Sequence, residues 1–162
     1  MGYNPGAQLI DRNDRRKHGL EPVLRMAKVD DLEARGDTYL GRDAASEAGE
    51  IVFYREGIDA TVSVGESEDG DFTLSVNGKP DASTLPDDMV TQGLAGVIPL
   101  LQRPNARDVC LIGLGSGVTA GAILAFDVDR LDLAEISQAV IEGSRFFDPV
   151  SQAPLDDPRL HM

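Results

Sequence analysis

The sequence predicts an α/β fold in which a small antiparallel β-meander precedes the first half of a parallel sheet. Two observations predict it. After residue 49, three short runs of β-branched and aromatic residues, "IVFYREG", "ATVSVGES" and "FTLSVNG", are separated by the turn-type clusters "GID" and "EDGD". From Asp108 onward the pattern changes to strand, glycine turn, helix, strand and helix. The 162 residues suffice for one ordinary domain, or one and a half small ones.

Three segments are expected along the chain. Residues 1–49 mix charges without a sustained period, and we interpret them as an N-terminal arm of mixed charge. Residues 50–85 form the antiparallel β-domain, with Asn77 and Gly78 as a turn that ends its third strand and Asp81 in the link to the next element. Residues 86–162 form a partial α/β domain.

An amphipathic helix is predicted directly after the meander. In "STLPDD", Thr84 is the expected N-cap, with Asp87 three residues later. Apolar residues then recur at helical spacing, namely Val90, Leu94, Val97, Ile98 and Leu101.

The segment from Asp108 predicts a βαβ unit, which belongs in a parallel sheet. Its strands are "DVCLIG" and "RLDLAEI", and the second is followed by the helix "SQAVIEGSRFF", which Ser137 caps. A third strand is expected to begin in "DDPRLHM". Because parallel sheets need more strands and cover on both faces, we expect a fragment of a longer protein or half of an assembly, and hence a homo-oligomer.

The stretch "LIGLGSGVTAG" places Gly113, Gly115 and Gly117 between a strand and a helix. Such a turn lets backbone N–H groups approach a ligand without an intervening Cβ. The dinucleotide fingerprint requires a third glycine where Val118 stands, so the spacing favours a nucleoside over a nicotinamide dinucleotide. Glu135 ends the next strand, where its carboxylate can accept hydrogen bonds from ribose hydroxyls. Residues 86–162 are therefore interpreted as a partial nucleotide-binding domain.

The charge and the apolar runs exclude several classes of partner. The formal net charge is −13, and the acidic excess falls almost wholly after residue 49, so no nucleic-acid partner is expected. No membrane segment and no signal peptide are predicted, and Cys110, expected as a lone buried thiol, suits a reducing cytoplasm. His18 and His161 suggest no metal site.

Residues from about Glu50 to His161 resemble the spermidine synthase (polyamine aminopropyltransferase) family. The likeness rests on "REGIDATVSV", "LSVNGKPDAST", "DDMVTQGLAGVIPLLQRPNARDVCLIGLGSGVTAG" and "LDLAEISQAVIEGSRFF". It implies a small N-terminal β-domain joined to a class I methyltransferase-like (Rossmann-like) nucleotide fold. "NGKPDAS" and "GLGSGVTAG" are similar to a branch often fused to a membrane transporter-like segment. Residues 1–49 would then follow such a segment, and a longer parent would be membrane-tethered.

The resemblance implies a transferase that moves an aminopropyl group to an amine. The donor is decarboxylated S-adenosylmethionine or a related adenosyl thioether such as S-adenosylmethionine, used as a co-substrate, with no tightly bound cofactor. It would lie beside Gly113, Gly115, Ser116 and Gly117, with Glu135 on the ribose.

The small-molecule amine would lie near Asp81, Asp87 and Asp88, although the last two are better explained as charges that cap a helix. The acceptor amine is not identified.

The chain also departs from the family pattern. The family places an acid within the glycine turn where Ser116 stands, Gln where Asp81 stands, and Tyr and Glu where Thr91 and Gly93 stand. The main acidic catalytic motif would lie beyond Met162, so the catalytic residues are unknown and we expect this chain alone to be inactive. Two alternatives stay open, a catalytically degenerate nucleoside-binding or regulatory module and an S-adenosylmethionine-dependent methyltransferase.

Overall fold

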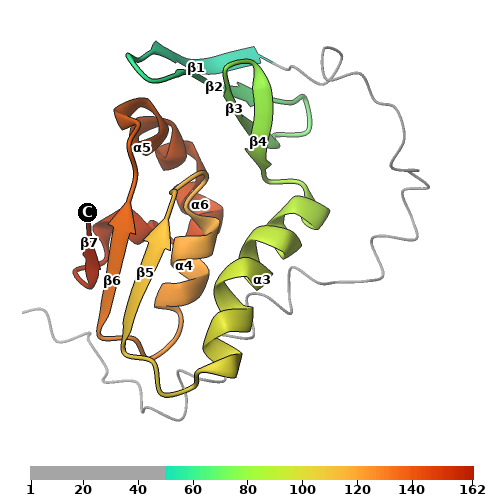
Figure 1. Cartoon of the computed structure of the whole chain (residues 1–162). Helices are drawn as coiled ribbons and strands as arrows, with labels where there is room; N and C mark the ends of the chain where they lie inside the picture. Colours follow the sequence, from blue (N-terminus) through green and yellow to red (C-terminus); the bar gives the residue numbers. More distant parts are fainter. Residues whose placement is uncertain (1–49) are drawn as a thin grey trace, which may run out of the picture.

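A computed structural model of the chain describes residues 50–162, and the arm predicted over residues 1–49 lies outside the described residues. The predicted fold class is confirmed. Four antiparallel strands form one sheet in the order β1-β2-β3-β4, and three parallel strands form a second in the order β5-β6-β7. The small sheet lies across the carboxyl ends of β5 and β6 (Figure 1).

The small sheet has one strand more than the sequence predicts. Its strands are β1 (Glu50–Glu56), β2 (Thr61–Glu66), β3 (Phe72–Val76) and β4 (Lys79–Ser83). Asn77 and Gly78 do form a turn, with φ of 53° and 78°, but it joins two strands as a tight hairpin. Asp81 therefore lies in a strand and not in a link. The strand was missed because it is five residues long and contains Pro80, which an edge strand tolerates.

The second part of the chain alternates strands with helices. Its elements are α3 (Pro86–Gln102), β5 (Asp108–Ile112), α4 (Val118–Leu124), β6 (Arg130–Ala134), α5 (Gln138–Ser144), η1 (Arg145–Phe147), α6 (Asp148–Ser151), η2 (Pro154–Asp156) and β7 (Leu160–His161). The predicted cap of α5 is confirmed, since the Ser137 side chain accepts a hydrogen bond from the amide of Val140. β7 pairs in parallel with β6, as expected for a third strand beginning near the C-terminus.

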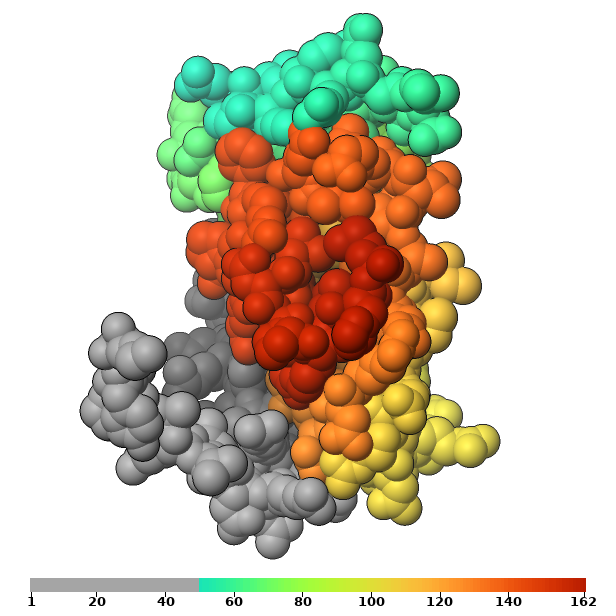
Figure 2. All heavy atoms as spheres, turned by 90° about the vertical axis from the view of Figure 1, so that its left-hand side faces the viewer, coloured from blue at the N-terminus to red at the C-terminus, as the bar shows by residue number. Residues whose placement is uncertain are grey.

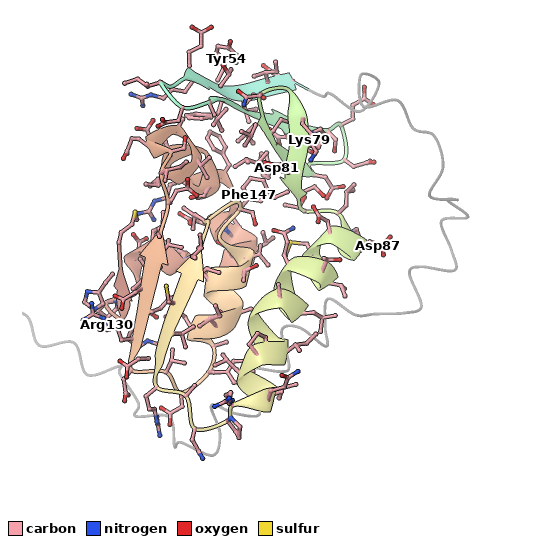
Figure 3. The ribbon with its side chains drawn as sticks, in the orientation of Figure 1. Tyr54, Lys79, Asp81, Asp87, Arg130 and Phe147 are labelled. Carbon is pink, nitrogen blue, oxygen red and sulfur yellow. The ribbon has the colours of Figure 1, made fainter. Side chains whose placement is uncertain are left out.

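One apolar core joins the two sheets. Phe147 is fully buried and points from η1 toward the small sheet (Figure 3). It shares a core cluster with Leu74 of β3, with Leu133 of β6 and with Leu114 of the glycine turn. Residues of both sheets are therefore buried by the same contacts, and the position of the glycine turn depends on them.

A second cluster lies between the parallel sheet and α3 and α4, and Arg159 closes its edge. The guanidinium donates to the carbonyl oxygens of Leu124, Phe126 and Val128, at 2.7 to 3.3 Å, and pairs with Asp157 at 2.6 Å. These bonds satisfy carbonyl groups at and beyond the end of α4, which would otherwise lack partners. The segment that includes Arg159 lies at the surface between the small sheet and the lower part of the molecule (Figure 2).

The prediction that Thr84 caps the N-terminus of α3 is wrong. The N-cap is Leu85, which has no capping side chain. Thr84 instead donates to Asp71 and accepts from the amide of Phe72, because it lies beside β3 and not above the helix. Asp88, from the first turn of α3, reaches back to Ser83 and holds the junction between β4 and the helix.

The predicted apolar face of α3 is only partly buried. Val97 is buried, but Leu94, Ile98 and Leu101 are exposed. Glycines explain the difference, because a Cβ at Gly96 would lie only 2.8 Å from the carbonyl oxygen of Thr119 in α4. Because glycine has no side chain, α3 and α4 approach most closely on the face of α3 that contains Gly96. That face packs against α4, and the face with Leu94, Ile98 and Leu101 does not.

Cys110 is exposed, and the prediction of a buried thiol is wrong. It points to the open face of β5, together with Asp108 and Ile112, whereas Leu111 packs into the core. On the neighbouring strand, the Arg130 guanidinium hydrogen-bonds Asp132 and holds the pKa of that carboxyl below its ordinary value. Within residues 50–162 this face therefore carries charged side chains beside the thiol.

Gly121 provides a test of this packing. A Cβ at Gly121 would lie 1.9 Å from the Ser151 carbonyl oxygen, so Gly121→Ala should separate α4 from α6 and lower the free energy of unfolding by about 2 kcal/mol or more. Urea denaturation measures it. Gly143→Ala is the matched control, because its nearest neighbours are side-chain atoms 3.4 Å away. A Gly121→Ala protein as stable as the parent would contradict the packing.

Candidate functional site

The glycine turn has one open side and one packed side. Gly113, Gly115 and Gly117 have φ of 87°, 56° and 83°, a region that residues with a Cβ rarely adopt. A Cβ at Gly113 or Gly115 would meet nothing within 4 Å, whereas one at Gly117 would lie 3.2 Å from the ring of Pro154. Gly113 and Gly115 therefore border free space at the carboxyl end of β5.

Glu135 holds this turn to the end of β6. Its carboxylate accepts one hydrogen bond from the amide of Leu114, at 2.9 Å, and another from the amide of Ser137, at 2.8 Å. The amide of Gly113 adds a bond of 2.8 Å to the carbonyl oxygen of Ala134. The structure thus brings together the glycine turn and the carboxylate that the sequence singled out, and a carboxylate retains further lone pairs for a ligand.

Two backbone amides in the turn have no acceptor. Among residues 50–162, the N–H groups of Gly115 and Ser116 make no hydrogen bond, whereas those of Gly113, Leu114 and Gly117 all do. The unpaired amide of Gly115 borders open space and can donate to an acceptor atom of a ligand, and the Ser116 amide follows it in a residue that is almost fully buried.

The side chain of Ser116 is turned inward. The residue is 2% exposed, and its hydroxyl donates to Gln92 Oε1 and accepts from the amide of Val118, 3.3 Å away. Any contact of Ser116 with a ligand must therefore use its backbone N–H. The sequence did not reveal Gln92, because the two residues meet only when α3 packs beside the turn.

The three acidic residues predicted for the amine are not gathered together. Asp81 is exposed on β4, and Asp87 points outward from the start of α3 (Figure 3). Asp88 is half-buried, and its carboxylate is bonded to the amide of Ser83, at 2.5 Å, and to its hydroxyl, at 2.9 Å. Within the described part of the chain, the Asp88 carboxylate therefore has a structural role, because it accepts two hydrogen bonds from Ser83.

A cavity of about 260 Å³ lies at the other end of the sheet, away from the glycine turn. It is lined mainly by apolar side chains, with two arginines and one aspartate, and its walls include Leu100, Ala106, Phe126 and Val128. Arg107 there is already paired with Asp127. None of the residues that line this cavity belongs to the glycine turn.

Residues 50–162 contain neither a membrane-spanning helix nor a cluster of metal ligands. No helix in this range has the length and apolar character needed to cross a membrane. No group of three or more His, Cys, Asp or Glu side chains in the same range is arranged to hold a metal ion.

Several curated proteins named polyamine aminopropyltransferase match the chain. The one from Caldicellulosiruptor bescii is 36% identical over 78 residues, that from Thermoanaerobacter sp. is 32% identical over 81, and that from Clostridium perfringens is 28% identical over 80. Each match covers 48% or 49% of this chain and 28% or 29% of the relative. No family model matches.

Solved structures show the same fold. A spermidine synthase in complex with the transition-state analogue AdoDATO matches with a TM-score of 0.62 and 24% identity, covering 68% of this chain and 39% of its own. The spermidine synthase from Thermotoga maritima matches with the same values. The chain is thus similar in part of its sequence to polyamine aminopropyltransferases, and in its fold to spermidine synthases. The methyltransferase-like fold expected from the resemblance is thereby confirmed.

The chain spans less than a third of the length of the curated relatives it matches. The activity of those relatives therefore depends on residues outside the part that matches this chain.

The hydrogen bonds of Glu135 make a testable prediction. Glu135→Ala leaves the amides of Leu114 and Ser137 without acceptors, so the free energy of unfolding should fall by about 1 to 3 kcal/mol and the Leu114 amide should exchange faster. Urea denaturation and hydrogen exchange measure the two effects.

Glu68→Ala, at an exposed hairpin tip, is the control for the same change of side chain. It should alter stability by no more than about 0.5 kcal/mol. Equal urea midpoints for the two variants would show that Glu135 does not hold the turn.

Proposed function

We propose that this chain carries the nucleoside-binding half of an aminopropyltransferase-like site. The ligand is an adenosyl sulfonium compound, decarboxylated S-adenosylmethionine or S-adenosylmethionine, or the related thioether. It lies over the open side of the turn at Gly113 and Gly115, and receives hydrogen bonds from the amides of Gly115 and Ser116. Gly117 lies on the packed side of the turn, against Pro154. The Glu135 carboxylate accepts hydrogen bonds from the ribose hydroxyls.

One observation carries the proposal, the hydrogen bond between the amide of Leu114 and Glu135. It sets a carboxylate beside a turn that has unpaired amides and free space, which is the arrangement a nucleoside requires. The matches to polyamine aminopropyltransferases support the class of ligand, and a structural neighbour of the same fold is in complex with AdoDATO.

The amine would approach from the side of β4 and α3. Asp81 is exposed there and Asp87 is half-buried, and Asp88 contributes negative charge while it stays bonded to Ser83. An ammonium or a neutral amine is favoured over an anion by this acidic surface. We propose residues 50–85 and 86–162 as the two functional parts, one on each side of the ligand.

Ser116 favours a second candidate, a nucleoside-binding module that does not transfer the aminopropyl group. The hydroxyl is neutral and already engaged with Gln92 and Val118, so the turn offers no carboxylate to an aminopropyl ammonium. A ligand with a neutral substituent on sulfur would then bind as well as one with a charged amine.

We also propose a homo-oligomer in a reducing cytoplasm. The outer edge of β5 has no partner strand within residues 50–162, and Ile112 beside it is 85% exposed. Strand edges and exposed apolar residues promote association. The unpaired thiol of Cys110 suits a reducing compartment.

Calorimetry tests the proposal and separates its two forms. The full chain is titrated with decarboxylated S-adenosylmethionine, S-adenosylmethionine and methylthioadenosine. Tighter binding of the decarboxylated donor than of methylthioadenosine supports the transferase form, and equal binding supports the neutral module. Absence of binding by all three would overturn the nucleoside site itself.

Gly115→Asn is the sharpest variant for this titration. Asn tolerates positive φ, and its side chain would occupy the free space above the turn, so affinity should fall at least about tenfold without loss of stability. Gly70→Asn is the matched control, because Gly70 also has positive φ and open surroundings but lies at a hairpin of the small sheet. Unchanged affinity in Gly115→Asn would remove the ligand from this turn.

A further inference from the structure

Gln92 lies in α3 and bonds to two parts of the fold that are distant in sequence. Its Nε2 donates to the carbonyl oxygen of Ser83, at the end of β4, over 3.0 Å. Its Oε1 accepts the hydroxyl hydrogen bond of Ser116, in the glycine turn. Since the amide uses its donor at one end and its acceptor at the other, the side chain is fixed in one orientation.

The backbone around Gln92 adds a third link. Thr119 Oγ1, in the first turn of α4, donates to the carbonyl oxygen of Gln92 at 2.9 Å. One helical turn later, Gly96 brings α3 so near to α4 that a Cβ would lie 2.8 Å from the carbonyl oxygen of Thr119. The distance from Gln92 to the glycine turn is therefore set by close backbone packing.

The group that Gln92 bonds at β4 is itself held in place. Ser83 is 8% exposed, and both its amide and its hydroxyl donate to Asp88 Oδ2. The Ser83 carbonyl oxygen is thus a fixed point on the small sheet and not a mobile loop atom.

At the other end, Ser116 passes this restraint to the backbone of the turn. Its hydroxyl accepts from the amide of Val118, two residues on, while it donates to Gln92. With the donor and the acceptor roles of the hydroxyl both used, the peptide groups from Gly115 to Val118 have one supported arrangement. In that arrangement the amides of Gly115 and Ser116 stay unpaired.

We propose that Gln92 is a positioning residue for the glycine turn. Through Ser116 it holds the backbone of residues 115–118 in the conformation that leaves two amides free for the ligand, and through Ser83 it ties this conformation to the small sheet. Gln92 does this without touching the ligand. The ligand part rests on the proposed function, whereas the restraint on the turn exists without any ligand.

Hydrogen exchange on the unliganded full chain tests the restraint. Gln92→Ala and Ser116→Ala should each speed exchange in the segment 111–121 by about fivefold or more, since a lost buried hydrogen bond is worth about 1 kcal/mol or more. The effect of the double variant should be smaller than the sum of the two single effects, because both changes break the same bond between Ser116 and Gln92, although Ser116→Ala also removes the acceptor of the Val118 amide. Gln102→Ala, on the exposed last residue of α3, is the matched control and should leave the segment unchanged.

Additive effects in the double variant, or no effect of Gln92→Ala, would overturn the proposal. If Gln92→Ala lowers the urea midpoint too far for a folded sample, Ser116→Ala decides alone. It removes a single oxygen atom from the other end of the link, and unchanged exchange in segment 111–121 would be the contradicting result.

Affinity for methylthioadenosine provides the second readout. Gln92→Ala should weaken binding at least about fivefold at a protein concentration and temperature where both proteins are fully folded, and Gln102→Ala should not. If the parent chain binds neither methylthioadenosine nor the two S-adenosylmethionine forms, the proposed function fails, and hydrogen exchange still decides whether Gln92 positions the turn. Parent-like affinity in Gln92→Ala together with faster exchange would restrict its role to the free protein and contradict the ligand part.

Discussion

The burial of Leu114 in the core that joins the two sheets is the constraint on which the rest depends. Leu114 is 4% exposed and packs in the same cluster as Phe147 and Leu74, so the turn between Gly113 and Gly117 begins from a fixed point. The adjoining amide is bonded to Glu135. The turn beside the free space is therefore held in place by buried contacts, and Leu74 of the small sheet is part of them.

The sequence revealed the features that depend on local chemistry. Glycines after a strand, a carboxylate after the next strand and Ser137 before a helix each act within a few residues of their position. Contacts between segments that are distant in the chain could not be predicted from the sequence. The bond from Gln92 to Ser116 spans 24 residues and exists only because glycines bring α3 against α4. The exposure of Cys110 likewise follows from which face of β5 is covered, and an apolar sequence run does not specify that face.

Two carboxylates show how position decides the use of a charge. Asp88 begins a helix, yet its oxygen is bonded to Ser83 of the neighbouring strand and stabilises the junction. Glu135 has a similar structural task at Leu114 and Ser137, but it stands beside open space and keeps capacity for a ligand. Ser116 marks the limit of the family likeness, because the turn is held there by a neutral hydroxyl paired with Gln92.

The proposed site predicts that a nucleoside binds over the glycine turn of this chain. Mapping the binding site by NMR tests this most directly. The ¹⁵N-labelled full chain is titrated with methylthioadenosine while its amide resonances are followed. We expect the largest shifts at Gly113, Gly115 and Ser116, with none at Arg103 or Phe126 of the cavity at the other end of the sheet. Shifts confined to that cavity, or no shifts at saturating ligand, would contradict it.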